Sequence, residues 1–144
     1  MSASPPLKPA QDFSFIRDGE LRRIVERDYA ELQTLNADTG TKSILIMSGS
    51  VIEGLLLDTT VTAGTVTKDK AAQMTLEELL GAASKSGIVP EDRVSNAVRK
   101  YRNLIHPARE IRDKIVFTSA DATLARAGVD VIIQDIRSYV QNKP

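Results

Sequence analysis

The residues best suited to chemistry lie in one short segment, RKYRNLIHP, at residues 99–107. It contains Arg99, Arg102, Asn103 and the single histidine of the chain, His106. A guanidinium group binds phosphate oxygens through two parallel hydrogen bonds, and an imidazole exchanges a proton near neutral pH. Together these residue types indicate a site that binds a phosphate group and moves a proton beside it.

Helical spacing brings several of these side chains onto one face of a helix that we expect Pro90 to open. The apolar stripe of that helix is formed by Val94, Val98, Tyr101 and Ile105. The polar residues along its flank are Ser95, Arg99, Arg102 and His106, with Arg109 at the nearer edge. Pro107 lacks an N–H and disfavours helical angles in the residue before it. We therefore expect the helix to kink or stop there, which would leave His106 at a helix end.

Glu53 is the second residue that the sequence singles out, because it is the one charge in the apolar stretch 43–57. Burying an unpaired carboxylate is strongly destabilising, so we expect it to be paired, neutralised or turned outward. The donors expected nearby are Arg99, Arg102 and His106. We interpret Glu53 as a supporting residue rather than a reacting group.

Composition excludes several classes of function. The chain has 144 residues, and its 19 lysines and arginines balance 19 aspartates and glutamates, so it does not coat nucleic acid through bulk charge. It has no cysteine, which rules out disulfides, cysteine-ligated metals and thiol catalysis. With one histidine as well, we expect neither a metal centre nor a cofactor.

The length predicts one domain, with residues 1–12 as a flexible N-terminal arm and 13–144 as the folded part. The arm has no apolar run behind a charged head, as a signal peptide would. The stretch 43–57 is too short to cross a membrane. We therefore expect a cytoplasmic protein without a membrane partner.

Apolar residues recur at helical spacing along most of the folded part. We expect helices over 18–36, over 42–59, from Thr75 to Ser86, from Pro90, and from Thr118 onward, with a loop over 61–70. The helix over 42–59 is apolar nearly all round, which predicts a central position. Thr75 with Glu78, and Thr118 with Asp121, have the spacing of capping boxes. The fold class predicted is all-α, an antiparallel bundle of four to five helices.

One short motif resembles that of a known family. RNLIHP at residues 102–107, late in a helical bundle, is similar to the signature of the HEPN domains (higher eukaryote and prokaryote nucleotide-binding). These are bundles of four or five helices whose motif combines an arginine, a polar residue and a histidine. The resemblance extends over residues 26–29, the segment SGSVIEGLL of the second helix, and the final helix.

The resemblance implies a function. Active HEPN proteins are metal-independent endoribonucleases, often of toxin–antitoxin, abortive-infection or CRISPR-linked systems, and they usually pair so that two motifs face one cleft. In this sequence His106 would act on the attacking 2′-hydroxyl or on the leaving 5′-oxygen. Arg102 or Arg99 would stabilise the phosphorane, and Asn103 would orient the pair. The expected partners are a second copy of the chain, RNA or a nucleotide, and an antitoxin or another product of the same operon.

Two other interpretations stay open. The chain could be a noncatalytic homodimeric module of a defence or regulatory operon, which its zero net charge and few aromatic residues favour. Glu53 and Arg102 would then form a structural pair between two helices. Alternatively, the same cleft could sense a nucleotide or another phosphate ligand.

Overall fold

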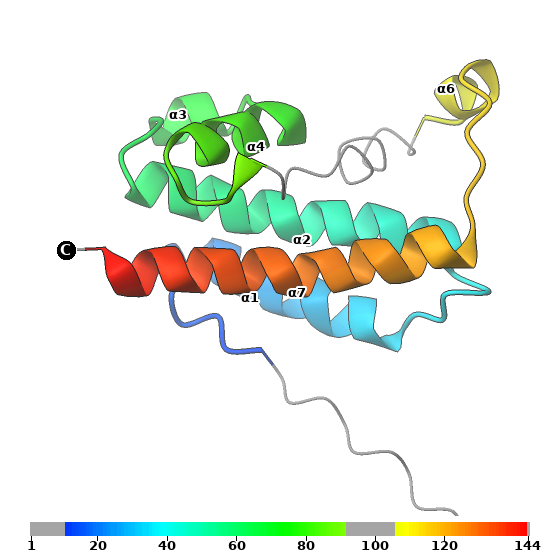
Figure 1. The fold of residues 1–144 in the computed structure, drawn as a ribbon, viewed down its shortest axis with the longest axis horizontal. Helices are drawn as coiled ribbons and strands as arrows, with labels where there is room; N and C mark the ends of the chain where they lie inside the picture. Colours follow the sequence, from blue (N-terminus) through cyan, green and yellow to red (C-terminus); the bar gives the residue numbers. More distant parts are fainter. Residues whose placement is uncertain (1–10, 92–105, 144) are drawn as a thin grey trace, which may run out of the picture.

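The structure, a computed structural model, describes residues 11–91 and 106–143. This part of the chain forms six helices and no strand, so the predicted all-α bundle is confirmed (Figure 1). The helices are α1 (Gly19–Thr34), α2 (Thr41–Thr62), α3 (Lys68–Ala71), α4 (Leu76–Lys85), α6 (Pro107–Arg112) and α7 (Ser119–Asn142). The expected helix that would span residues 92–105 lies outside the described residues.

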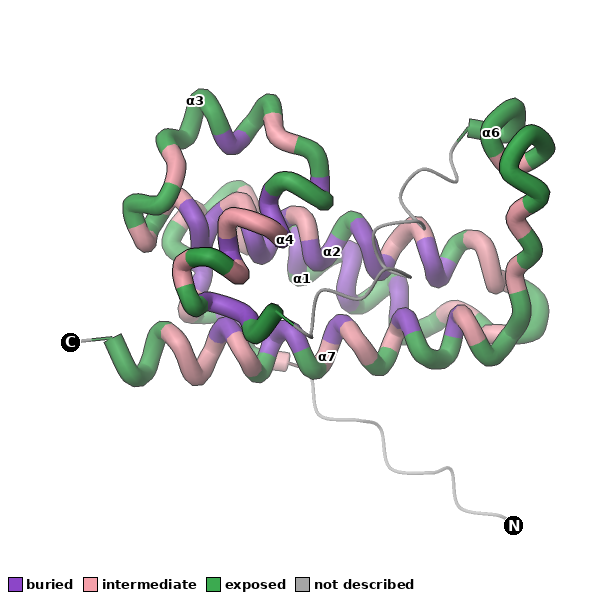
Figure 2. Tube along the Cα trace, turned by 45° about the horizontal axis from the view of Figure 1, so that its top comes forward, coloured by how far each residue is buried: buried purple, intermediate pink, exposed green. Residues whose placement is uncertain are grey.

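Helix α2 is the centre of the bundle, as its sequence predicts. Apolar residues over most of the circumference of this helix are buried, and α1, α4 and α7 each pack against it (Figure 2). One strip is not buried: Ser50 is exposed, and Ile46, Glu53 and Leu57 are half-buried. By length and composition α2 could also cross a membrane, but 67% of its most apolar window is buried inside the bundle. That burial is typical of the core helix of a soluble protein.

The three long helices do not all alternate in direction. Leu45 near the start of α2 packs against Ala125 near the start of α7. Thr59 and Tyr139, near the two C-terminal ends, lie around one hollow. Helices α2 and α7 therefore run parallel, whereas α1 runs antiparallel to them (Figure 1).

Polar contacts fasten α7 to α1. The Tyr29 hydroxyl donates a hydrogen bond of 2.6 Å to Asp130, and Arg126 donates one of 2.6 Å to the carbonyl of Leu35. Burial raises the pKa of the Tyr29 phenol above its usual range, and the bond to Asp130 raises it further. Tyr29 therefore remains a neutral donor at physiological pH, and Arg126 satisfies a carbonyl that the end of α1 leaves without a helical partner.

The helix starts follow the predicted capping chemistry. Thr75 and Thr118 each accept the backbone N–H of a residue three positions on and form complete capping boxes. Asp18 caps α1, and the N–H groups of Leu21 and Glu20 hold the pKa of its carboxyl below the usual range. These caps explain why the starts of α1, α4 and α7 can be read from the sequence.

The loop predicted over residues 61–70 is partly wrong. Helix α2 continues to Thr62, and α3 begins within the expected loop at Lys68. The hydroxyls of Thr59 and Thr60 donate to the carbonyls of Leu55 and Leu56, one turn earlier in the helix. These hydrogen bonds satisfy the buried hydroxyls, so the two threonines are accommodated within α2. Pro90, expected as the first residue of a helix, is not itself helical, but Glu91 directly after it is in a 3₁₀ turn.

Helices α1 and α2 approach each other closely at Gly54. A Cβ atom on this glycine would lie 2.7 Å from Cγ2 of Val25, closer than packed carbon atoms tolerate. The neighbouring helix that crosses here thus requires a residue without a side chain at position 54.

We expect Gly54→Ala to destabilise the protein by about 1–3 kcal/mol, because the added methyl group overpacks the α1–α2 contact. Gly81→Ala in α4 is the matched control, since a Cβ there would meet no atom within 4 Å. Because alanine has a higher helix propensity than glycine, Gly81→Ala should raise the free energy of unfolding by up to about 1 kcal/mol. Urea unfolding measures both, and a Gly54→Ala protein as stable as the parent would contradict the close approach.

Candidate functional site

His106 lies at the start of a helix. It is exposed, its backbone is extended (φ −110°, ψ 92°), and Pro107 is the first residue of α6. The carbonyl of His106 accepts the N–H groups of Arg109 and Glu110 at 3.0 and 3.1 Å. The break expected at Pro107 is therefore present, but it opens a new helix, because proline is favoured in a first helical turn.

This break corrects the expected position of Arg109. Arg109 was expected at the edge of the apolar stripe of a helix that kinks or stops at Pro107, but it belongs to α6, which begins at Pro107. It is exposed, as are Arg112 and Lys114 beyond it. Residues 106–114 therefore present one histidine and three cationic side chains to solvent on a short projecting element (Figure 2).

Contacts at the starts of α2 and α7 hold this element in place. Lys42 Nζ, at the start of α2, lies 2.8 Å from Oε2 of Glu110 on α6. Beyond α6, Ile115 and Phe117 pack against the buried pair Leu45 and Ala125. The exposed segment is thus attached to the core through one ion pair and one small apolar cluster.

The chain reverses sharply after α6. Lys114 has φ 50°, in the left-handed region that glycine prefers, and the N–H of Ile115 donates to the carbonyl of Glu110 at 3.1 Å. This turn leaves Ile111 and Val116 each 80% exposed, around an open hollow of about 520 Å³ that Pro107 also lines. The surface beside His106 is therefore apolar as well as cationic.

Only one of the other predicted site residues lies in the described part of the chain. Arg99, Arg102, Asn103 and Ser95 lie outside the described residues. Glu53 is half-buried on α2 and takes part in an interaction of its own. Of the predicted cluster, the structure thus describes only His106, Glu53 and Arg109.

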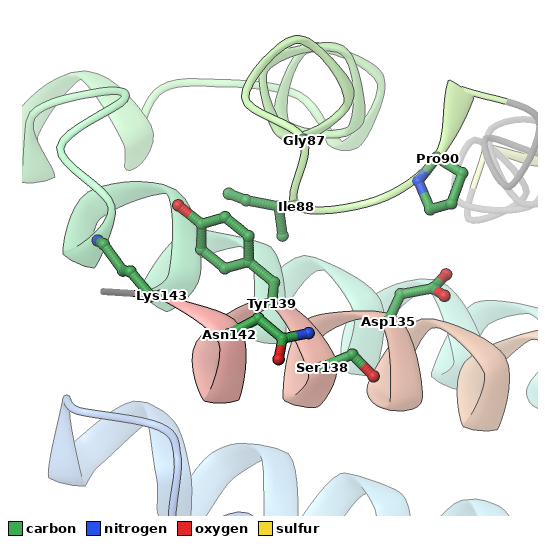
Figure 3. Close-up of a pocket in the computed structure, with 8 residues that line it drawn as sticks. All are labelled: Gly87, Ile88, Pro90, Asp135, Ser138, Tyr139, Asn142 and Lys143. Atoms are coloured by element: carbon green, nitrogen blue, oxygen red, sulfur yellow. The ribbon is translucent and has the colours of Figure 1, made fainter.

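A second hollow, which the sequence did not reveal, lies between the turn after α4 and the end of α7 (Figure 3). It has a volume of about 600 Å³ and is lined by Ile88, Pro90, Asp135, Tyr139 and Lys143, among others. The Tyr139 ring points toward Ile88, with the Lys143 ammonium 5.9 Å from its centroid. Helical spacing in the sequence places Tyr139 on the core side of α7. The sequence therefore did not indicate this hollow, because the hollow forms between Tyr139 and the turn at Gly87, which is distant in the chain.

The buried carboxylates of the bundle serve the fold. Asp58 accepts the backbone N–H groups of Arg17 and Asp18, and Asp28 accepts Nε of Arg27 at 2.8 Å. Across residues 11–91 and 106–143, no three histidine, aspartate or glutamate side chains are grouped so that they could hold a metal ion. Residues 106–114 carry three exposed cations, of which Arg112 places its Nε 3.1 Å from Oδ1 of Asp113.

Comparisons of the chain with protein-family models, with curated proteins and with solved structures give no match in any of the three.

We expect Lys42→Ala to loosen α6 without unfolding the bundle. An ion pair of this exposure contributes about 0.5–1 kcal/mol, so tryptic cleavage after Arg109, Arg112 and Lys114 should be roughly two- to fivefold faster. Lys68→Ala is the control, because Lys68 is 81% exposed and lies 3.7 Å from Asp18, in a different part of the bundle. Equal cleavage rates in the two variants would show that the Lys42–Glu110 pair does not hold α6.

Proposed function

We propose that this chain is a HEPN-like domain that binds RNA or a nucleotide phosphate and acts as a metal-independent endoribonuclease of a cytoplasmic toxin or defence system. The observation that supports it is the exposed position of His106 at the start of α6, followed by the exposed cations Arg109, Arg112 and Lys114. An accessible imidazole beside several cations is the minimum that cleavage of a phosphodiester without a metal ion requires.

The proposed reaction is an attack within the RNA itself. His106 either removes the proton of the 2′-hydroxyl or donates a proton to the leaving 5′-oxygen. The bond from the 2′-oxygen to phosphorus forms, and the bond from phosphorus to the 5′-oxygen breaks. The products are a 2′,3′-cyclic phosphate and a 5′-hydroxyl, so the proton lost by one oxygen is balanced by the proton gained by the other.

The remaining residues of the motif would assist this step. Arg102 or Arg99 stabilises the negative charge on the phosphorane, and Asn103 orients the arginine and histidine. Ser95 and Glu53 support these side chains from the neighbouring positions. Arg109, one turn into α6, holds the RNA backbone beside the reacting phosphate.

A second candidate function is a noncatalytic interaction module. Two large aliphatic side chains, Ile111 and Val116, are each 80% exposed beside the cationic segment, and such exposure is typical of surfaces that contact another protein. In that case residues 106–116 would bind an antitoxin or another product of the same operon.

The test of the first function is incubation of purified protein with mixed RNAs in the presence of a chelator. We expect cleavage products with cyclic phosphate ends, and a loss of about 100-fold or more in rate for His106→Ala, because general acid–base catalysis contributes that much. Lys68→Ala removes an exposed cation that lies beside Asp18 rather than beside His106, and it should leave the cleavage rate unchanged.

The result that would contradict catalysis is no cleavage, or cleavage that His106→Ala leaves unchanged. Circular dichroism of each variant separates lost function from lost fold. If cleavage is absent but His106→Ala or Arg109→Ala weakens binding of a labelled single-stranded RNA, the chain binds RNA without cutting it. If neither cleavage nor binding occurs, the noncatalytic module is the function that remains.

A further inference from the structure

An apolar hollow begins one residue from His106. It has a volume of about 520 Å³, and Pro107, which directly follows His106 in the chain, is part of its lining. The polar lining residues are Glu110 and Lys114, and the apolar ones are Pro107, Ile111, Ile115 and Val116; together they form what we call the α6 hollow. A ligand held at His106 therefore has an apolar surface directly beside it.

The α6 hollow is attached to the core of the bundle. Ile115 packs against the buried residues Leu45 and Ala125. The N–H of Ile115 donates to the carbonyl of Glu110 at 3.1 Å, which closes the turn after α6. The side chain of Glu110 lies 2.8 Å from Nζ of Lys42 on α2. The hollow is thus formed by contacts within the chain, so a ligand does not have to order it on binding.

Two residues of the α6 hollow are unusually exposed. Ile111 and Val116 are each 80% exposed, more than Leu124 of α7, which is 68% exposed. One aliphatic side chain exposed by itself is ordinary on a protein surface. Two of them that line the same hollow indicate a ligand that contacts both.

We propose that the α6 hollow binds the base of a nucleotide next to the phosphate held at His106, an inference that rests on the proposed function. An RNA chain with a phosphate at His106 has a base on the nucleotide to either side of that phosphate, and the hollow is the adjoining apolar surface. The faces of a base are flat and stack between apolar side chains as well as between aromatic ones. Ile111 and Val116 are the side chains that contact the base.

The charges of the α6 hollow match a nucleotide. Its one carboxylate, Glu110, pairs with Lys42, which leaves the ammonium group of Lys114 as the other charge of the lining. The hollow therefore combines an apolar surface with a positive charge. A nucleotide offers the complement, an apolar base beside a negative phosphate, and Lys114 contacts the phosphate that adjoins the bound base.

The hollow contacts a base through its faces and not through its edges. The side chains of Pro107, Ile111, Ile115 and Val116 have no hydrogen-bond donor or acceptor, so they do not read the Watson–Crick edge. Affinity then depends on the presence of a base more than on its identity. The base has to be unpaired to enter, because a paired base is stacked inside its duplex.

Two labelled probes separate the base from the sugar–phosphate backbone. The first is a short single-stranded RNA of mixed sequence, and the second is the same chain with abasic sugars, which keeps every phosphate. Both have 2′-O-methyl groups, so that binding to the full chain is measured without cleavage. Fluorescence anisotropy should show that the parent protein binds the RNA about tenfold more tightly than the abasic chain.

Substitutions in the hollow should remove this difference. Ile111→Ala and Val116→Ala should each weaken binding of the RNA roughly three- to fivefold and leave binding of the abasic chain unchanged. Leu124→Ala is the matched control, because Leu124 is also highly exposed but does not line the hollow, and it should bind both probes like the parent. Arg109→Ala should weaken both probes by the same factor, because a phosphate contact does not depend on the base.

The outcomes distinguish this inference from the proposed function. Equal affinity of the parent for the two probes would overturn base binding and leave RNA binding by the cations intact. The same conclusion follows if Ile111→Ala and Val116→Ala weaken RNA binding no more than Leu124→Ala does. A parent protein that binds neither probe would overturn the proposed function and this inference together, and the α6 hollow would then be assigned to a protein partner. Circular dichroism of each variant checks that its fold is unchanged, as the exposure of these side chains leads us to expect.

Discussion

The burial of α2 over most of its circumference is the constraint on which the rest of the structure depends. A helix that is apolar all round must be enclosed, and α1, α4 and α7 enclose it here. Enclosure requires close approach, which Gly54 permits against Val25. It also sets the roles of the charged residues: those of α7 turn to its flanks and interact with α1 and its neighbours, for example Arg126 with the carbonyl of Leu35. The candidate functional residues, His106 and those of α6, lie outside this core.

The candidate site is attached to the core from outside. His106 and α6 stand outside the enclosed core and are attached to it by the Lys42–Glu110 ion pair and by Ile115 and Phe117. A site attached in this way leaves its imidazole and its cations exposed, as the proposed binding of RNA requires. The same attachment leaves Ile111 and Val116 uncovered, which is why a protein partner is the competing explanation for this surface.

The sequence predicted the elements whose causes are local. Capping residues located the starts of α4 and α7, and the apolar run of α2 predicted its central position, because these signals lie within a few residues of what they control. It did not predict α6, since a proline after a helical pattern equally marks an end or a new start, and that ambiguity placed Arg109 on the wrong helix. The hollow at Tyr139 depends on how the turn after α4 lies against α7, and periodicity alone does not give that.

The central claim is that an enclosed α2 forms the stable core and that α6 with His106 is attached to it from outside. Native-state hydrogen exchange measures this residue by residue. The account predicts that amides in the middle of α2, from Ile44 to Leu56, exchange only with the free energy of global unfolding. It predicts that the α6 amides of Glu110–Arg112 exchange through local opening at a much lower free energy. Equal protection of α6 and α2, or exchange of the α2 amides below the global free energy, would contradict it.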